Sequence, residues 1–211
     1  MDRGLALPRT ANTIKQQDRF KAGAELRKRV VEAASRMFAA EGYESVSVRR
    51  IAQLAGCSQM AMYRHFPDKA SLITHVCVEL YSNQTVRNNQ QVAHIASPLK
   101  RLLTAGHLSI EMAVKNPHHY RLAFLTPLPV EDARRIRAEV AKPAIDFFRQ
   151  SLREALPAST PPEVLEARLH QCFACLHGTI VLLITYPQNY GLTHKKALQE
   201  FDEMFTRIVE D

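Results

Sequence analysis

Glycine is scarce in this chain, with 7 residues among 211, and no run alternates β-branched with polar residues. Leucine, alanine and arginine are plentiful instead. Helices disfavour glycine, whereas half-buried strands alternate β-branched with polar residues. The sequence therefore predicts an all-α fold, and 211 residues are enough to bury a full core in one large or two small domains.

The chain also lacks an apolar run that approaches the roughly 20 residues of a membrane span, and its N-terminus, MDRGLALPRT, lacks a signal-peptide core. Four cysteines are too unevenly spread to suggest a disulfide framework: Cys57, Cys77, Cys172 and Cys175. We therefore expect a cytoplasmic protein with reduced thiols and without a membrane partner.

Recognisable catalytic patterns are missing. The sequence contains no phosphate-binding loop, no nucleophile elbow and no convincing pair of carboxylates. His170, Cys172, Cys175 and His177 have the chemistry of metal ligands, but two helical turns separate the two histidines. A tetrahedral site there would need severe distortion or a partner element. We therefore expect no metal, no cofactor and no enzymatic activity.

Positive charge is concentrated in the first third of the chain. The net charge is +7. Residues 1–75 hold 13 Lys and Arg against 7 Asp and Glu, whereas residues 76–211 hold 15 against 14. A polyanionic partner would need such a concentration of positive charge, although a basic tail that aids solubility accounts for part of it.

The stretch 45–66, SVSVRRIAQLAGCSQMAMYRHF, predicts two short helices separated by a tight turn. Ser47 and Ser58 are good N-caps, and Gly56 can adopt positive φ between the helices. Ile51, Leu54 and Ala55 give the first helix an apolar face, and Met62 and Phe66 give one to the second. Gln59, Tyr63 and Arg64 then point outward, as in a helix-turn-helix that reads the major groove. A surface helical hairpin on a larger core is the alternative.

The neighbouring segments make the pattern more specific. A helix is predicted over Glu25–Glu41, ended by Gly42 and followed by Tyr43, and Asp68-Lys69 begins the next helix. This ordered set resembles the DNA-binding domain of the TetR family of bacterial transcriptional regulators over residues 25–75. The matching residues are Phe38, Gly42, Tyr43, Ser47, Val48, Ile51, Ala52, Ala55, Gly56, Ser58, Met62, Tyr63, His65, Phe66, Lys69 and Leu72.

The resemblance implies a homodimer that binds double-stranded operator DNA, usually as a repressor, and is released by a small molecule bound in its C-terminal domain. It places Gln59, Met60, Tyr63 and His65 on the recognition helix. Gln59, and secondly Arg64, can read bases, while hydroxyl, imidazole and ammonium groups suit phosphates. The predicted DNA-binding residues are Ser47, Arg49, Arg50, Gln59, Met60, Tyr63, Arg64, His65 and Lys69.

Three regions follow from this division: a basic flexible arm (1–23), the helix-turn-helix domain (24–71) and a larger helical domain for ligand binding and dimerisation (72–211). The arm either touches phosphates or a minor groove, or is a plain disordered terminus. Helices are expected over 68–91, 98–115, a short stretch from Pro117, 131–156, 163–186 and 193–210. Pro143 should kink or break the helix that contains it.

Large aromatic residues and histidines in the second domain either line a cavity or pack as ordinary core. The candidates for contact with a lipophilic, aromatic effector are Tyr81, His107, Tyr120, Phe124, Phe147 and His177. His107 lies on an apolar stripe, where a hydrogen-bonded core histidine is the commoner outcome.

The last two helices carry surplus apolar positions, which predicts a four-helix bundle across a dimer. Burial of the same stripe within one subunit is the alternative. The candidate interface residues are Ala167, Ala174, Gly178, Phe201, Phe205 and Ile208. The stretches NPHHYRLAFL and Leu176–Gly178 further resemble a TetR subgroup marked by a Trp-His-Gly motif, with Leu176 where tryptophan would stand.

Two functions from different classes therefore remain. The first is a ligand-controlled DNA-binding regulator. The second is a helical enzyme or carrier in which His107, His118, His119 and His177 surround a catalytic cavity. The helix-turn-helix pattern and the concentration of positive charge in residues 1–75 favour the DNA-binding regulator.

Overall fold

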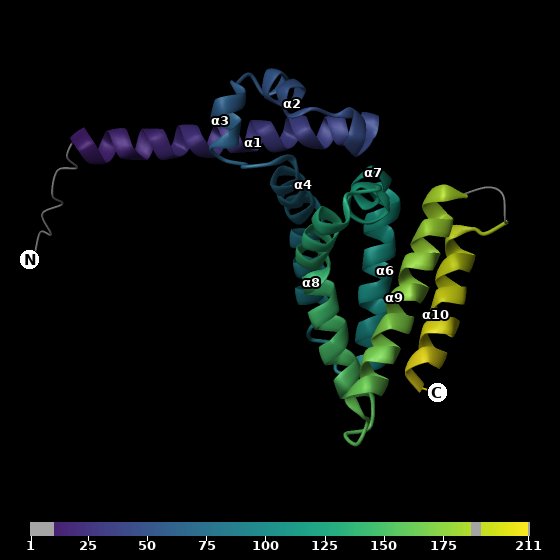
Figure 1. Cartoon of the computed structure of the whole chain (residues 1–211). Helices are drawn as coiled ribbons and strands as arrows, with labels where there is room; N and C mark the ends of the chain where they lie inside the picture. Colours follow the sequence, from purple (N-terminus) through teal and green to yellow (C-terminus); the bar gives the residue numbers. More distant parts are fainter. Residues whose placement is uncertain (1–10, 187–190, 211) are drawn as a thin grey trace, which may run out of the picture. The chain divides into compact units, whose positions relative to one another are not determined.

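The computed structural model describes residues 11–186 and 191–210, with the side chains of residues 11–19 and Leu80 excepted. Throughout this part of the chain the regular structure is helical (Figure 1), as the composition predicts. The chain divides into two compact units, Met1–Leu72 and Ile73–Asp211. The expected boundary, at residues 71/72, differs from this one by a single residue.

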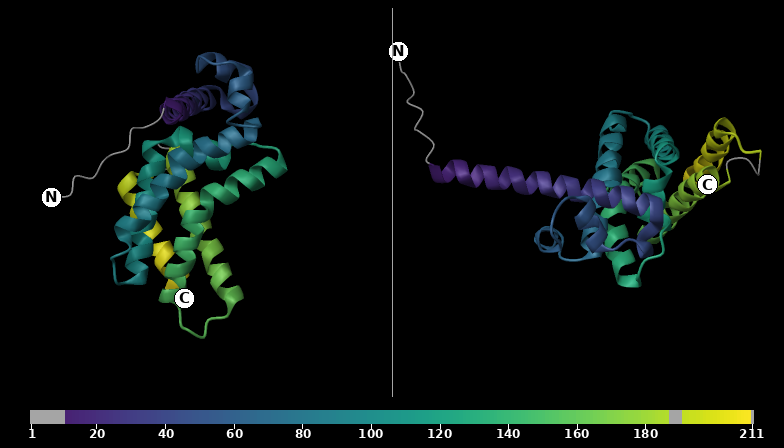
Figure 2. Two further views of the ribbon diagram at one scale, coloured as in Figure 1. Left: turned by 90° about the vertical axis from the view of Figure 1, so that its left-hand side faces the viewer. Right: turned by 90° about the horizontal axis from the view of Figure 1, so that it is seen from above.

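Unit 1 contains α1 (Ala11–Ser45), α2 (Val48–Leu54), α3 (Gln59–Tyr63) and the start of α4 (Lys69–Cys77). Helix α1 begins at Ala11, so the expectation of an unstructured arm is wrong for residues 11–23 (Figure 2, right). Alanine, lysine, glutamine and arginine, which favour helix, make up seven of these 13 residues, and Gly23 costs only about 1 kcal/mol within a helix. Residues 1–10 of the expected arm lie outside the described residues.

Gly42 ends the regular part of α1, as predicted, because its φ of 78° leaves the helical region. The chain then returns across the apolar face of α1, and the ring of Tyr43 stacks on Phe38 at 6.1 Å between centroids. Helix α2 packs on α1, and Ile51, Met62 and Phe66 are buried in this unit. Leu54 was expected there as well but is 52% exposed, and Ala52 takes the buried place in α2.

Unit 2 is a helical bundle. It contains the rest of α4, η1 (Val78–Ser82), α5 (Asn83–Val92), α6 (Pro98–Lys115), α7 (Pro117–Tyr120), η2 (Arg121–Leu125), α8 (Val130–Ala155), α9 (Pro162–Thr185) and α10 (His194–Glu210). The segments η1 and η2 are π-helical turns, which occur frequently at functional sites. Neither turn was predicted.

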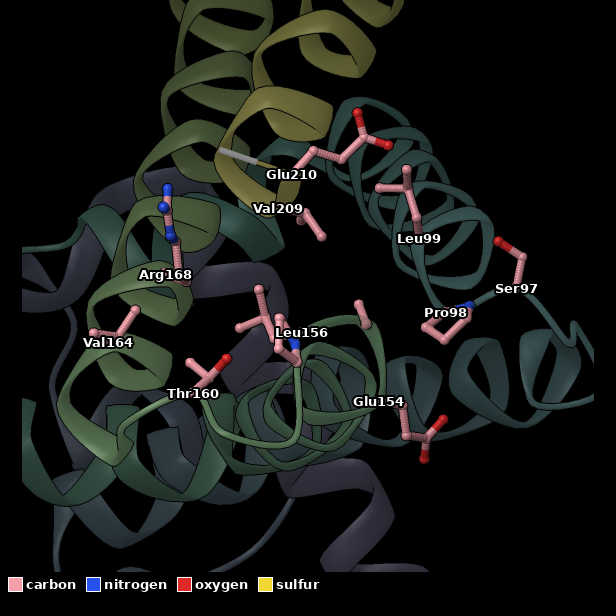
Figure 3. A pocket seen from close by; sticks show the side chains of 12 residues that line it. Ser97, Pro98, Leu99, Glu154, Leu156, Thr160, Val164, Arg168, Val209 and Glu210 are labelled. Carbon is pink, nitrogen blue, oxygen red and sulfur yellow. The ribbon is translucent and has the colours of Figure 1, made fainter.

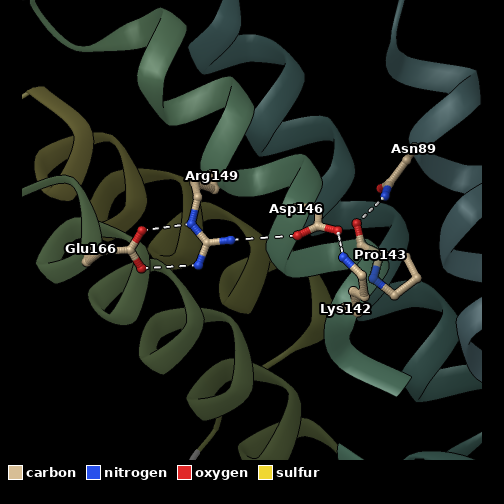
Figure 4. Close-up of polar contacts among 6 residues, drawn as sticks. All are labelled: Asn89, Lys142, Pro143, Asp146, Arg149 and Glu166. Atoms are coloured by element: carbon tan, nitrogen blue, oxygen red, sulfur yellow. Dashed lines mark hydrogen bonds and ion pairs between the residues drawn. The ribbon is translucent and has the colours of Figure 1, made fainter. Parts of the chain in front are cut away.

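Helix α8 continues through Pro143, so of the two expected outcomes, a kink or a break, the break does not occur. A proline removes one backbone N–H, and a long helix that packs on its neighbours tolerates this loss. Asn89 of α5 donates from Nδ2 to the carbonyl of Pro143 at 3.0 Å. Arg149 of the same helix forms a bidentate pair with Glu166 of α9, at 2.7 and 3.1 Å (Figure 4). These contacts hold α5, α8 and α9 together.

Helices α9 and α10 run antiparallel as neighbours (Figures 1 and 2). Among the described residues, α9 is the one helix whose length and mean hydropathy would allow it to cross a membrane. This differs from the expectation that no segment approaches a span. Within unit 2, α9 packs against α6, α8 and α10.

A close approach fixes α10 on α6. A Cβ added at Gly106 would lie 2.5 Å from Cζ of Phe201, so only glycine leaves room for this ring. Next to it, His107 Nε2 lies 2.6 Å from Oδ1 of Asp202. The aromatic side of α10 therefore belongs to the core of its own unit.

Candidate functional site

The outer surface of α3 is the first candidate site. Ser58 caps this helix by accepting from the N–H of Ala61 at 3.1 Å, and Gly56 provides the turn before it with a φ of 67°. Met62 points inward and is buried. Gln59 and Arg64 are exposed, Met60 is 69% exposed and Tyr63 45%. The helix thus presents an amide, a guanidinium, a thioether and a phenol on one open surface.

From the sequence, His65 is expected on the recognition helix, but the structure places it in the turn after that helix. Helix α3 ends at Tyr63, and the N–H of His65 bonds to the carbonyl of Met62 at 2.9 Å. The imidazole is half-buried and lies near Gly23 of α1. His65 therefore sits at the edge of the α3 surface.

The start of α2 contributes three of the predicted residues. Ser47 accepts from the N–H of Arg50 at 3.3 Å, which caps the helix as predicted. Arg49 is exposed and makes no ion pair among the described residues. Arg50 donates to both carboxylate oxygens of Glu41, at 2.6 and 2.8 Å, and this hydrogen bond lowers the pKa of Glu41. The pair ties α2 to the end of α1, a contact that sequence reasoning missed.

Lys69 occupies a more enclosed place than a simple phosphate-binding lysine. Its ammonium group donates to the carbonyl of Tyr43 and lies 4.0 Å from the centroid of that ring, a cation–π contact. Burial lowers the pKa of Lys69. In this structure, Lys69 therefore joins the start of α4 to the turn after α1.

Four of the six predicted ligand residues meet in unit 2. The ring of Tyr81 lies 4.9 Å from that of Phe124, which lies 5.0 Å from Tyr120 and 5.1 Å from His177. The hydroxyl of Tyr120 is hydrogen-bonded to Nδ1 of His177. We call Tyr81, Tyr120, Phe124, Phe173 and His177 the aromatic cluster. The turns η1 and η2 supply two of its rings, Tyr81 and Phe124.

Burial governs the charge of the cluster. It raises the pKa of Tyr81 and of Tyr120, and it lowers the pKa of His177. All three groups are therefore neutral at pH 7. The result is an apolar, π-rich site with one internal hydrogen bond, and it carries no charge that would attract an ion.

Phe173 was missed by sequence reasoning, although its place four residues before His177 puts both on one side of α9. Its ring centroid lies 6.1 Å from that of His177. The other two predicted ligand residues make no ring contact or hydrogen bond with the cluster among the described residues, and contact other parts of unit 2 instead. His107 touches Phe201 and Asp202, and Phe147 touches Phe148.

The predicted interface residues fall into two groups. Ala167, Ala174 and Gly178 are exposed along α9. Phe201 and Phe205 are completely buried within unit 2, so their assignment to the surface of a dimer is wrong, and Ile208 is half-buried. The apolar stripe of α10 packs on its own α6 and α9, which was the alternative left open by the sequence.

A groove of about 530 Å³ at one end of unit 2 contains none of the predicted site residues (Figure 3). The ends of α6, α8 and α10, the loop after α8 and the first turns of α9 surround it. Leu99, Leu156 and Val209 provide apolar lining, while Glu154 and Arg168 carry opposite charges. Glu154 is already paired with Arg101 of α6.

The histidines and cysteines of α9 do not form a metal site in the part of the chain that the structure describes. Cys172 is buried, whereas His170 is exposed on another side of the helix. No three His, Cys, Asp or Glu side chains among the described residues gather as metal ligands. Burial also raises the pKa of Cys172, to about 12, so this thiol is protonated at neutral pH.

Comparisons with known proteins agree with this architecture. Residues 30–76 match the family model described as bacterial regulatory proteins, tetR family. Residues 102–211 match the model of the Tetracyclin repressor-like C-terminal domain. An uncharacterized HTH-type transcriptional regulator of Mycobacterium tuberculosis is 27% identical over 128 residues, which cover 59% of this chain and 61% of that protein.

Nucleoid occlusion factor SlmA of Alteromonas mediterranea is 28% identical over 116 residues, covering 55% of this chain and 59% of that protein. The chain thus spans about three fifths of the length of the curated relatives it matches. Among solved structures, the regulator FadR of Bacillus subtilis, in complex with stearoyl-CoA, has a TM-score of 0.71. The two sequences are 16% identical, and the superposition covers 87% of this chain and 97% of that structure.

A likeness at 16% identity shows a shared fold and carries no ligand over. The two family models, however, cover both units and together account for most of the chain. The chain belongs to the TetR family of bacterial regulatory proteins.

Proposed function

We propose that this protein is a DNA-binding transcriptional regulator, a dimeric repressor that leaves its operator when a small molecule binds in unit 2. The observation that carries the proposal is the exposed surface of α3, on a helix held by a serine cap and a glycine turn. Such a helix fits the major groove, where its first residues reach the base edges. This role would place the protein in the cytoplasm.

On that surface, Gln59 is the base-reading residue, because its amide can form a bidentate contact to adenine. Arg64 is the second base reader. Met60 is exposed and apolar enough to contact a thymine methyl group. Its position at the start of α3 supports this role.

The remaining predicted residues contact the DNA backbone. Ser47, Tyr63 and His65 donate to phosphate oxygens, and beside them Arg49 adds a charge that has no ion pair among the described residues. Arg50 and Lys69 are held by Glu41 and Tyr43 in this structure. Their remaining N–H donors can still reach a phosphate, but these internal contacts give both residues a first role in positioning α2 and α4.

Two copies are needed for tight binding, and α9 supports a dimer. Ala167, Ala174 and Gly178 leave its outer side smooth, and Leu182 adds an apolar side chain that is 42% exposed. Less than a third of its most apolar window is buried within one chain. A second copy of α9 and α10 would cover this surface and form a four-helix bundle. The two reader helices would then lie about one DNA turn, roughly 34 Å, apart.

The aromatic cluster is the proposed effector site. Flat faces around one Tyr–His hydrogen bond suit a lipophilic, aromatic molecule with a single polar group. Tyr81 lies in η1, which directly follows α4, and α4 begins in unit 1. A ligand that moves Tyr81 would therefore act on the helix that enters the reader domain.

The enzyme or carrier alternative gains no support from the histidines. His107 contacts Asp202 and Phe201, whereas His177 contacts Tyr120 and Phe124. A catalytic histidine cavity would require these side chains to converge. The family contains regulators, which also favours the first function.

Selection of bound duplexes from random DNA, with the full chain, tests the proposal. We expect enrichment of an inverted repeat whose half-sites are about 10 bp apart or a multiple of that. Repeating the selection with a library of lipophilic compounds should identify an effector that releases the DNA. Recovery of random sequences without any enriched motif would contradict sequence-specific regulation.

A further inference from the structure

A second cavity in unit 2, of about 370 Å³, lies between α5, α6 and α7, and the proposed function makes no use of it. Its volume falls in the range of small-molecule sites. Leu108 and Met112 of α6 form an apolar part of its lining, while Asn88, Lys115 and His119 bring polar groups from three helices. Apolar lining with a few convergent polar groups is typical of a ligand site.

Asn88 is the most informative of these residues. Its side chain is only 6% exposed. The oxygen Oδ1 accepts from Nε2 of Gln84 at 2.9 Å, whereas Nδ2 makes no hydrogen bond among the described residues. No buried side-chain nitrogen or oxygen in that part of the chain lacks a partner, so Nδ2 must be accessible from the cavity. The two N–H donors of this buried side chain therefore face the cavity, which is open to solvent beside the exposed residues Lys115 and Asn116.

Lys115 provides a cation at the same cavity. Its only ion pair among the described residues is with Glu111, one helical turn earlier, at 3.4 Å. Both side chains are largely exposed, and such pairs contribute little to stability. The ammonium group can therefore turn toward a ligand at small cost.

His119 completes the polar side. Burial, and secondly the neighbouring His118, lower its pKa, so that it is neutral at pH 7. A neutral imidazole offers one N–H donor. The cavity thus presents donors from Asn88, Lys115 and His119, with Glu111 as the one carboxylate in its lining.

We propose that this cavity binds a small monocarboxylate, with its oxygens on Asn88 Nδ2 and the Lys115 ammonium group. The alkyl part of the ligand lies on Leu108 and Met112. The contact with the Lys115 ammonium group is the stronger of the two, because both partners are ionised. Glu111, which is paired with Lys115, limits the site to ligands with a single negative charge. Helix α7 brings His119 to this cavity and Tyr120 to the aromatic cluster, so the two sites share one helix.

Titration calorimetry of the full chain with hexanoate, and with hexanamide of the same length, tests the proposal. We expect hexanoate to bind at least tenfold more tightly than hexanamide. Asn88→Asp replaces the donor with a carboxylate of the same shape and should weaken hexanoate binding at least tenfold. Lys115→Gln should weaken it severalfold, whereas Lys142→Gln, which removes an exposed lysine with a similar ion pair on α8, should leave it unchanged.

Equal binding of hexanoate and hexanamide, or no binding of either, would overturn the proposal. So would unchanged hexanoate affinity in Lys115→Gln, an exposed position where the fold is not at risk. Circular dichroism shows whether Asn88→Asp is folded. If it is not, the hexanoate affinity of Lys115→Gln tests the proposal by itself. The assay contains no DNA, so its failure would leave the proposed regulatory function untouched.

Discussion

The hydroxyl of Tyr120 and Nδ1 of His177 form a hydrogen bond that joins α7 to α9 inside the aromatic cluster. The ring of Phe124 lies beside both partners, 5.0 Å from the ring of Tyr120 and 5.1 Å from that of His177. A buried polar pair of this kind stabilises the fold only while both partners are present. It therefore provides a direct probe of the cluster.

Tyr120→Phe removes the hydroxyl and leaves the ring in place. Because Nδ1 of His177 loses its partner in a largely buried site, we expect unfolding free energy to fall by about 1–3 kcal/mol. Urea denaturation measures the change. Tyr81→Phe is the matched control, since the hydroxyl of Tyr81 makes no hydrogen bond among the described residues, and it should cost much less. Equal losses in both variants would contradict the role of the pair.

His177 should make stability depend on pH. Burial lowers the pKa of its imidazole below the ordinary value of 6.5. Between that lowered pKa and pH 6.5, the unfolded chain binds more protons than the folded protein, so stability falls as the pH drops through this window. Above pH 6.5, both states are neutral and the contribution is complete. His119 contributes in the same direction.

His177→Asn keeps an acceptor for Tyr120 and removes the titrating ring. The loss of thermal stability between pH 7 and pH 5 should be smaller in this variant than in the wild type. Melting temperatures measured at half-unit intervals test this. A wild type and a variant that lose the same stability over that range would show that His177 is not the titrating group.

Gly106 is needed because Phe201 approaches it closely. An added methyl group would meet the ring at 2.5 Å, so Gly106→Ala should destabilise unit 2 by about 1–3 kcal/mol. The gain in helix propensity from alanine, about 1 kcal/mol, offsets only part of this. Phe201→Leu opens space at the same point. Gly106→Ala should therefore lower the free energy of unfolding less in the Phe201→Leu background than in the wild type. An equal loss in both backgrounds would contradict the close approach.

The outer side of α9 should hold the dimer together. Ala174→Arg places a long cation on this smooth surface, and we expect sedimentation velocity to show a shift from dimer to monomer. Ala138→Arg makes the same change at an exposed alanine of α8 and should leave the dimer intact. A dimer that survives Ala174→Arg, or a wild type that is monomeric, would place the interface elsewhere or exclude it.

Local sequence signals predicted the helix-turn-helix domain well, and also the limits of one helix in unit 2. Ser47 and Ser58 cap their helices, Gly42 and Gly56 adopt positive φ, and Pro98–Lys115 is helical over the predicted range. Caps, glycine turns and an apolar face act over one or two helical turns, so a short window of sequence contains their causes.

Contacts between distant segments were not predictable in the same way. The pair of Arg50 with Glu41, the packing of Lys69 on Tyr43 and the burial of Phe201 each depend on how helices meet. The stripe of α10 is a clear example, because an amphipathic helix has the same sequence pattern whether it packs on its own chain or on a partner. The π-turn at Val78–Ser82 interrupts a continuous helical pattern without a proline or glycine signal.

Recognition of DNA sequence by α3 is the central feature of the proposed function. It is tested most directly by the dissociation constants of the wild type and Gln59→Ala for the selected duplex and for a shuffled duplex, at matched salt. We predict that the wild type prefers the selected duplex by about 10³-fold or more. Gln59→Ala should lose about 1–3 kcal/mol of this preference and keep its affinity for the shuffled duplex. Equal affinity of the wild type for both duplexes, or undiminished preference in Gln59→Ala, would contradict this role of α3.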